Sequence, residues 1–445
     1  MKNTPVAFLF IGAALVSLLA GLVFGVIGGL QYVLPEFLKE HFPFIKTRPM
    51  HVTLIVTWLF TGAIGGIYHY LPQLHQGKLY SVRLALWHFV IFIATGLAII
   101  TCYVMGYFGG KEYFEFPPII AMPMMLTWIL FAINFFKSIH IKINAWPVYI
   151  WMWATGVIFF LITFTEAFLW TIPYFGNNIV RDMTVQWKAT GTFIGSWNML
   201  IYGTAFYVMN KISGEDKIVH SPYTFFFYFL GLINLMFNWG HHTYVVPAAG
   251  WIKNVSCVIS MTELLLLGSI IWSWRKSISD AKRNFHIIPF RLLSFADLWI
   301  FLNLILAILI SIPGINHYTH GTHITVGHAM GTTIGINTMI LFSSFYFIAG
   351  ITSFSSAASE SGKIKSGFWI ANISLLVFWV SLIGSGIVKA LEKENVIPFQ
   401  LMMQKLSPWF RAFTFSGFFL FIGLFLLTIP LMKVIYKKLS REEKK

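Results

Sequence analysis

Long apolar runs constrain this chain more than any other feature. Runs of roughly 20 apolar residues recur along nearly all of its 445 residues. A run of this length can cross a bilayer as one α-helix, whereas barrel strands would give shorter, alternating segments. Charged residues make up only 11% of the chain and hydrophobic residues 57%, whereas soluble proteins carry about 25% charged residues. The sequence therefore predicts an all-α integral membrane protein.

The runs predict twelve transmembrane spans, and no soluble module or low-complexity linker interrupts them. We therefore expect a single membrane domain over residues 1–445. The expected spans lie near residues 6–34, 51–72, 83–108, 119–137, 145–170, 187–210, 223–242, 252–275, 294–313, 322–348, 366–388 and 409–437.

Basic residues are concentrated in two segments, although the formal net charge of +15 could also suggest a nucleic-acid partner. The segments are the linker "RKSISDAKRNFHIIPFR" (275–291) and the tail "KVIYKKLSREEKK" (433–445). With a cytoplasmic N-terminus, most of the 31 Lys and Arg residues fall on the cytoplasmic side, so the positive-inside rule places both termini there. The basicity thus indicates topology, and we expect a lipid bilayer and no nucleic acid around this chain.

Few ionisable residues lie inside the expected spans. Such residues are functional candidates, because an unpaired charge in hydrocarbon costs several kcal/mol. The candidates are His51, Glu166, His241, His242, Glu263 and His328. The two cysteines, Cys102 and Cys257, lie in apolar runs and are interpreted as core residues and not as a disulfide.

Histidines from three separate spans are expected at one depth. In the predicted topology His51 opens the second span, His241 and His242 close the seventh, and His328 begins the tenth, all toward the outer face. Each histidine alone also fits a hydrogen-bonded core residue. Their convergence favours a metal or heme site, because neutral imidazole is a common ligand of iron and copper.

The stretch "HYTHGTHITVGHAMGTTIG" (317–335) carries the last of these histidines. The histidines at 317, 320 and 323 are expected to be hydrogen-bonding residues of an outer loop. Positions i and i+2 of a helix are about 200° apart, so His328 and Met330 face opposite sides and could each meet a heme. Gly327, Gly331 and Gly335 favour close helix packing, and room for a flat porphyrin stays open as an alternative.

Several segments together resemble the catalytic subunit of cytochrome-c-dependent nitric oxide reductase, in the heme–copper oxidase superfamily. The twelve expected spans also match that family, and the likeness covers nearly the whole chain. The segments are "FGVIGGLQYVLPEFL" (24–38), "RPMHVTLIVTWLFTGAIGGIYHYLP" (48–72), "EYFEFPP" (112–118), "GHHTYVVPAAGW" (240–251), "SMTELL" (260–265) and "NHYTHGTHITVGH" (316–328).

The resemblance implies a set of cofactors and residue roles. A low-spin heme b would be held by His51, a high-spin heme b by His328, and a non-heme iron by His241 and His242. Glu263 matches a catalytic glutamate near that iron and is a further candidate ligand. Glu115 is similar to a carboxylate that binds a calcium ion bridging heme propionates.

The chain departs from the family pattern at the predicted metal centre. Met330 replaces a second histidine of the tenth span, and a thioether is a competent axial ligand, so we expect His51 and Met330 to bind the low-spin heme. Thr190 stands where the family has the third histidine ligand of the non-heme metal. Ile194 and Asn198 replace two glutamates, which removes their share of proton transfer. The metal could then be iron or copper, or the site could be empty.

The resemblance implies a respiratory enzyme of denitrification in a prokaryotic cytoplasmic membrane. It would reduce nitric oxide to nitrous oxide with electrons from a membrane-anchored or soluble cytochrome c subunit on the outer face, because the chain has no CxxCH motif. Two alternatives stay open. One is nitric oxide dismutation or terminal oxygen reduction, and the other is a non-catalytic paralogue that transfers electrons or has a structural role.

Overall fold

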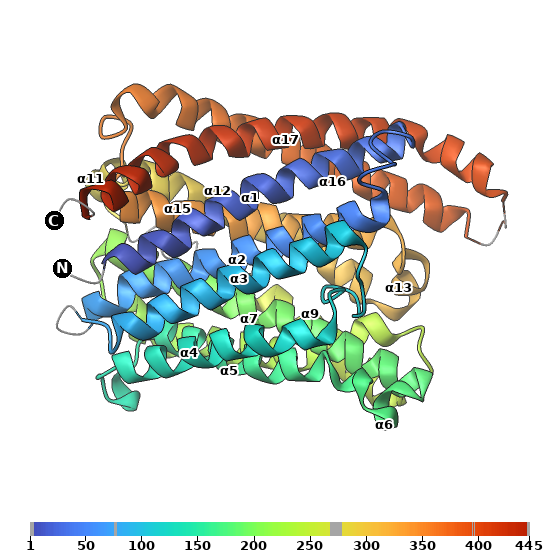
Figure 1. Cartoon of the computed structure of the whole chain (residues 1–445), viewed down its shortest axis with the longest axis horizontal. Coiled ribbons are helices and arrows are strands. Elements are labelled where there is room, and N and C mark those ends of the chain that lie inside the picture. Colours follow the sequence, from blue (N-terminus) through green and yellow to red (C-terminus); the bar gives the residue numbers. More distant parts are fainter. Residues whose placement is uncertain (1–3, 75–77, 268–277, 394, 396, 443–445) are drawn as a thin grey trace.

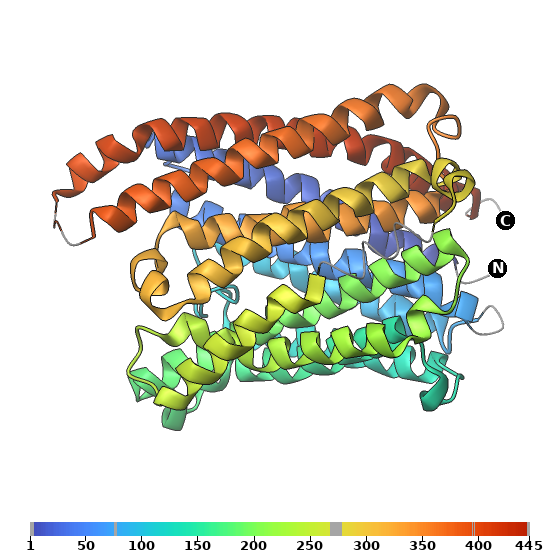
Figure 2. The same ribbon diagram turned by 180° about the vertical axis from the view of Figure 1, so that it is seen from behind.

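The protein is a bundle of long helices whose two termini lie at the same end, here called the terminal end (Figure 1; Figure 2 shows the opposite side). This computed structural model describes residues 4–74, 78–267, 278–393, 395 and 397–442. Within these ranges no β-strand is present, and only an isolated bridge joins Lys111 to Phe114. The expected all-α fold is confirmed.

Long helices occupy all twelve positions at which the sequence predicts a span. They are α1 (Thr4–Val33), α2 (Phe44–Leu74), α3 (Val82–Met105), α4 (Ala121–Ser138), α5 (Val148–Glu166), α7 (Ile179–Ser213), α8 (Pro222–Phe237), α9 (Gly250–Leu267), α12 (Ile287–Ser311), α14 (His323–Met330) continued by η6 (Gly331–Thr338) and α15 (Met339–Ala349), α16 (Ser361–Leu391), and α17 (Phe399–Glu442). Short helices α6 (Pro173–Gly176), α11 (Asp280–Phe285) and α13 (Pro313–Thr319) lie between them.

Nine of these helices, within the described ranges, are long and apolar enough to cross a membrane, which makes the chain a multi-pass membrane protein. The other three are α7, α8 and α9. Helix α8 has only 16 residues, and α9 adjoins residues 268–277, which lie outside the described ranges. For these three helices the membrane crossing stays a prediction.

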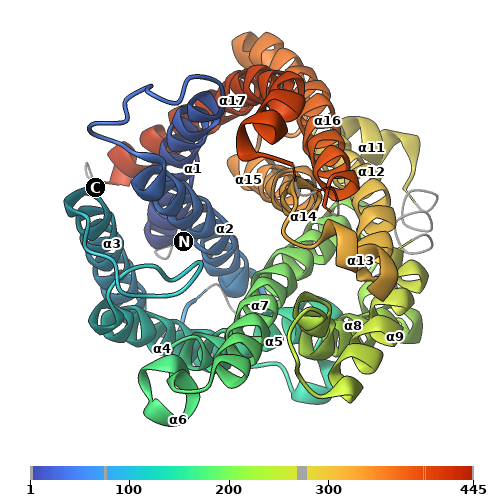
Figure 3. The ribbon, with the colours of Figure 1, turned by 90° about the vertical axis from the view of Figure 1, so that its right-hand side faces the viewer.

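The interior of the bundle is formed by α2, α7, α14 and α15, which the other long helices surround (Figure 3). Burial agrees with this arrangement, because the second half of α2 and nearly all of α15 are buried. Helices α1 and α2 pack along their length, as do α16 and α17, and α5 and α7. The interior helices are also those that carry His51, Trp187, His328 and Met330.

Two local features differ from the sequence prediction. Helix α2 begins at Phe44, so His51 lies two turns inside the helix and does not open it. The preceding turn is held by the Thr47 hydroxyl, which donates to the Phe42 carbonyl at 2.9 Å. Directly after Met330 the helix widens into a π-helical stretch, η6, and such stretches are frequent at functional sites.

Candidate heme and metal site

One large cavity of about 980 Å³ lies among the interior helices. Its volume is at the upper end of the roughly 300–1,000 Å³ typical of ligand pockets. The lining includes every histidine that the sequence places at one depth, together with the methionine of α14 and two further histidines. These residues are His51, His241, His242, His320, His323, His328 and Met330. The structure thus brings the predicted histidine and methionine ligands to one cavity, while their ligation stays a prediction.

His51 is held in one orientation by α1. Its Nδ1 atom lies 2.7 Å from the Gly21 carbonyl oxygen, so Nδ1 donates a proton there and Nε2 keeps its lone pair. This arrangement is typical of metal-ligating histidines, whose second nitrogen is fixed by a backbone acceptor. A Cβ at Gly25 would lie 2.8 Å from the His51 ring, so only glycine leaves this ring its position.

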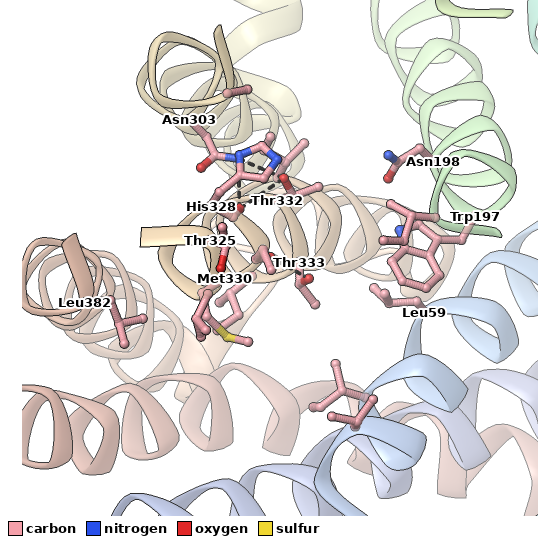
Figure 4. Close-up of a pocket in the computed structure, with 18 of the residues that line it drawn as sticks. Leu59, Trp197, Asn198, Asn303, Thr325, His328, Met330, Thr332, Thr333 and Leu382 are labelled. Carbon is pink, nitrogen blue, oxygen red and sulfur yellow. Dashed lines mark hydrogen bonds between the residues drawn. The ribbon is translucent and has the colours of Figure 1, made fainter. Parts of the chain in front are cut away.

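The imidazole of His328 and the thioether of Met330 lie on opposite sides of α14 (Figure 4), as their spacing predicts. The backbone is fixed from α12, because the Asn303 amide donates to the His328 carbonyl at 3.1 Å and to the Thr332 hydroxyl at 2.7 Å. The buried Nδ1 of His328 has no hydrogen-bond partner among the described residues.

The glycines of this helix allow close packing. A Cβ at Gly331 would overlap the side chain of Asn303, and a Cβ at Gly335 would overlap the ring of Trp299. Both side chains belong to the neighbouring helix α12. The structure therefore favours helix packing over porphyrin clearance at these two positions.

His241 and His242 lie on a 3₁₀ turn, η5 (Asn238–Thr243), which follows α8. The prediction that they close an α-helical span is corrected, because α8 ends at Phe237 and the two histidines lie on the turn that follows it. Their ring centroids are 4.2 Å apart. The Nδ1 atom of His241 lies 2.9 Å from the Asn238 side-chain oxygen, which leaves its Nε2 to meet a ligand. Asn238 is held in turn by hydroxyls of Ser256 and Ser260 in α9.

The α7 wall adds no third metal ligand beside these two imidazoles. Trp187 stacks on His242 with ring centroids 4.9 Å apart and planes inclined by 8°. Thr190 is buried, accepts a hydrogen bond from Gln186 at 3.4 Å, and is not among the lining residues. Asn198 does line the cavity, and its side-chain oxygen accepts a hydrogen bond from Asn337 at 2.9 Å.

A complete non-heme metal site is not assembled in the described part of the chain. No group of three or more His, Cys, Asp or Glu side chains there is arranged to hold a metal ion. The predicted role of Glu263 concerns a side chain that lies outside the described residues. Among the described residues, His241 and His242 are the candidate ligands of this metal.

The carboxylate proposed for calcium is paired with an arginine. Arg48 donates to Glu115 at 3.1 Å and also to Glu112, so one guanidinium joins two carboxylates near the cavity. The other Glu115 oxygen is buried without a partner among the described residues, and burial raises the pKa of Glu115. A cation could satisfy that oxygen, and calcium binding by Glu115 stays a prediction.

Three titratable residues line the cavity although the sequence did not predict them there; two of them, His320 and His323, were expected in an outer loop. The ring centroids of His320 and Trp187 are 6.2 Å apart. Burial, together with the Lys393 cation, lowers the pKa of His320. His323 lies 5.1 Å from the Phe410 ring. Asp297 lines the cavity from the middle of α12. The expected start of that span at residue 294 placed Asp297 near its edge, whereas α12 begins at Ile287 and places it inside.

The residues present fit heme. The cavity is large and mostly apolar. His51 offers its Nε2 atom, because its Nδ1 atom is already hydrogen-bonded to the Gly21 carbonyl. The Nδ1 atom of His328 is buried without a hydrogen-bond partner among the described residues, so the described residues alone do not satisfy this imidazole. Imidazole and thioether are both heme ligands. His51 and Met330 would hold one heme, and His328 the other.

Comparison with known proteins supports this interpretation. Residues 5–419 match the family described as cytochrome c and quinol oxidase polypeptide I. The chain is 24% identical to a nitric oxide reductase subunit of Stutzerimonas stutzeri, over 92% of this chain and 90% of that protein. It is 22% identical to the cbb3-type cytochrome c oxidase subunit CcoN1 of the same organism, over 91% and 89%.

A solved structure shows the same fold. A heme-copper terminal oxidase dimer superposes with a TM-score of 0.71, covering 98% of this chain and 84% of that chain at 12% sequence identity. At this identity the likeness concerns the fold alone.

Proposed function

Because this chain belongs to the cytochrome c and quinol oxidase polypeptide I family, and is therefore a membrane oxidoreductase, we propose that it reduces nitric oxide to nitrous oxide. The proposed reaction combines two NO molecules, two electrons and two protons into one N₂O and one water. Members of the family bind hemes and a metal at a binuclear site, and the 24% identity to a nitric oxide reductase subunit supports NO as the substrate.

One observation carries the proposal most directly. His328 and Met330 lie on opposite sides of one helix, and both line the one cavity, which also receives His51 from α2 and His242 from η5. Two hemes on the two sides of α14 account for this arrangement. When bound, the heme irons would supply one-electron transfer and a binding position for a diatomic gas.

The protein residues would hold the heme ligands in position and keep water out of the site. The Gly21 carbonyl fixes the His51 tautomer, and Asn303 fixes the backbone at His328. The aromatic and aliphatic lining excludes water, which strengthens electrostatic interactions within the site. His241 and His242 face the same chamber and would bind a non-heme iron or copper.

Electrons would come from a separate protein, because the sequence has no CxxCH motif for a covalent heme c. We propose a cytochrome c subunit, membrane-anchored or soluble, on the outer face of a prokaryotic cytoplasmic membrane. The loop histidines and the Arg48–Glu112–Glu115 cluster lie at the end of the bundle that is opposite the terminal end and that in this proposal faces outward. Both termini would then lie in the cytoplasm.

Oxygen reduction is a second candidate. It is favoured by the 22% identity to a cbb3-type cytochrome c oxidase subunit, which covers nearly as much of the chain as the likeness to the nitric oxide reductase subunit. The α7 wall also lacks the glutamates of the nitric oxide reductase pattern, since Ile194 and Asn198 stand there. Nitric oxide dismutation would produce N₂ and O₂ from the same substrate.

Product analysis on the purified full chain decides among these functions. The chain is expressed with heme, purified in detergent, and supplied with NO under a chemical reductant and a mediator. One N₂O formed for every two NO consumed supports the proposal. Oxygen or N₂ formed from NO would assign dismutation, and turnover with O₂ alone would assign oxygen reduction. Two hemes bound without turnover of either gas would contradict an enzymatic role.

A further inference from the structure

The cavity extends much farther toward the terminal end than the predicted ligands require. On α12 its lining residues run from Leu293 to Ser311, which is about 27 Å of helix at 1.5 Å per residue. On α7 the lining reaches Met209, four residues before the end of that helix. A membrane core is about 30 Å thick, so the cavity reaches through most of the expected bilayer.

The level of the predicted heme ligand is marked by Asn303, whose amide donates to the His328 carbonyl. The α12 residues Leu293, Asp297 and Ile300 line the cavity closer to the terminal end than this level. We call this part the inner lobe; on α7 it is lined by Tyr202, Phe206 and Met209. Asp297 lies six residues before Asn303, or about 9 Å along the helix.

Asp297 stands out among the carboxylates of the described spans. Only two carboxylates lie inside the nine membrane-spanning helices that the structure describes, Glu166 and Asp297. Glu166 is paired with Lys188 and does not line the cavity. Asp297 does line it, about 15 Å along α12 from Ile287, near the middle of the membrane. A carboxylate at such depth is costly and is retained mainly for function.

Among the described residues, the α7 wall of the cavity carries no carboxylate anywhere along its length. On α7 the cavity is lined by Ile194, Asn198 and Tyr202, and neither isoleucine nor asparagine can release a proton near neutral pH. The proposed reaction consumes two protons in each turnover. A proton donor must therefore come from another element, and α12 supplies one on the side of the cavity that reaches toward the terminal end.

We propose that Asp297 relays protons from the terminal end of the protein, through the inner lobe, to the reaction chamber. This inference rests on the proposed reductase function. In each relay step the O–H bond of the Asp297 carboxyl breaks, the proton passes through water to the oxygen that leaves as product water, and the carboxylate takes up a proton from the aqueous phase at the terminal end. The electrons come from the cytochrome c donor, so two relays and two electrons complete one turnover.

Proton uptake in liposomes tests this route. The full chain, loaded with heme, is reconstituted with a pH-sensitive dye inside or outside the vesicles, and turnover is started with NO and a reductant. The side of the membrane occupied by the terminal end is assigned by protease cleavage of the tail. In the wild type we expect the proton to disappear from the side that holds the terminal end.

Two substitutions of Asp297 separate relay from structure. Asp297→Asn keeps the size of the side chain and removes its proton, so proton uptake and turnover should fall by about 100-fold or more, while the heme spectra stay unchanged. Asp297→Glu should restore most of the rate. Glu166→Gln is the matched control, because it removes a carboxylate that lies in a span but does not line the cavity, and should leave turnover within about twofold.

The outcomes distinguish this inference from the proposed function. Wild-type turnover with unaltered proton uptake in Asp297→Asn would overturn the relay alone, as would uptake from the opposite side. If the wild type reduces O₂ and not NO, the reductase proposal fails, and the same variants still test the relay, since oxygen reduction also consumes protons. Turnover of neither gas would overturn both.

Discussion

The indole ring of Trp187 lies nearly parallel to the imidazole of His242, with centroids 4.9 Å apart and planes inclined by 8°. This stack places α7 directly against the two-histidine turn. Trp187 also lines the cavity, whereas Thr190, three residues later, does not. The family resemblance predicts the third metal ligand at the position of Thr190, whereas the α7 side chain that lines the cavity beside His242 is Trp187.

Restoring a third imidazole should therefore depend on the position chosen. We expect Trp187→His to place an imidazole beside His242 and to raise the bound iron, copper or zinc to about one ion per chain, because three histidines are a competent metal site. Elemental analysis of the purified protein measures this ratio. Thr190→His is the comparison variant and should add little metal. The reverse result would show that α7 is rotated toward Thr190.

The close approach of His51 to α1 gives a second prediction. Gly25→Ala would put a methyl group 2.8 Å from the His51 ring, so the ring must move and the heme content should fall from about two toward one per chain. The pyridine hemochrome assay measures the loss. Gly96→Ala in α3 is the matched control, because a Cβ there meets nothing within 4 Å. Full heme content in Gly25→Ala would argue against His51 as a ligand.

Much of the fold could be predicted because hydrocarbon imposes a simple rule on a spanning segment. About 20 apolar residues must form a helix, and the helices occupy all twelve expected positions. Helix ends were less predictable, because they depend on local polar contacts. The start of α2 at Phe44 is an example, since Lys46 and Arg48 are helical and bonded to Val104 and Glu115.

The candidate site was predictable in part. Topology placed His51 and His328 at one depth, and the structure has both in one cavity. The stack of Trp187 on His242 could not be predicted, because it depends on the rotation of α7 about its axis. Asp297 could have been found by its charge alone, as an ionisable residue in an apolar run, once α12 was given its full length.

Helix packing at the π-helical stretch gives a third prediction. Gly331→Ala would drive a methyl group into Asn303, and overpacking of this kind costs about 1–3 kcal/mol. We expect a lower midpoint of thermal unfolding in detergent. Gly327→Ala is the comparison, because its Cβ would lie 3.5 Å from Ile383, an ordinary contact. Equal midpoints for the two variants would show that α12 can retreat from this helix.

A carboxylate at the terminal end gives a prediction about pH. Hydrogen bonds from Lys433 and Lys363 hold the pKa of Glu360 below its ordinary value of 4.5. A lowered pKa in the folded state stabilises the fold above the ordinary pKa, and this contribution is lost as the pH falls through the lowered value. The thermal midpoint of Glu360→Gln should therefore lie below that of the wild type at pH 7.

The same comparison below about pH 4 should show the difference between wild type and Glu360→Gln shrinking. Glu36→Gln serves as the control, because it removes a carboxylate from an exposed pair with Lys39. A difference that stays constant across this range would mean that Glu360 acts through packing and not through its charge.

The position of Met330 leads to a prediction about the low-spin heme. A thioether ligand stabilises reduced iron relative to an imidazole ligand, so Met330→His should lower the potential of one heme by roughly 100 mV or more, within the range of about 0.8 V that axial ligands span. Redox titration followed by visible absorption measures the shift. The other heme, assigned to His328 on the opposite side of α14, should keep its potential. Unchanged potentials for both hemes in Met330→His would rule out ligation by this methionine.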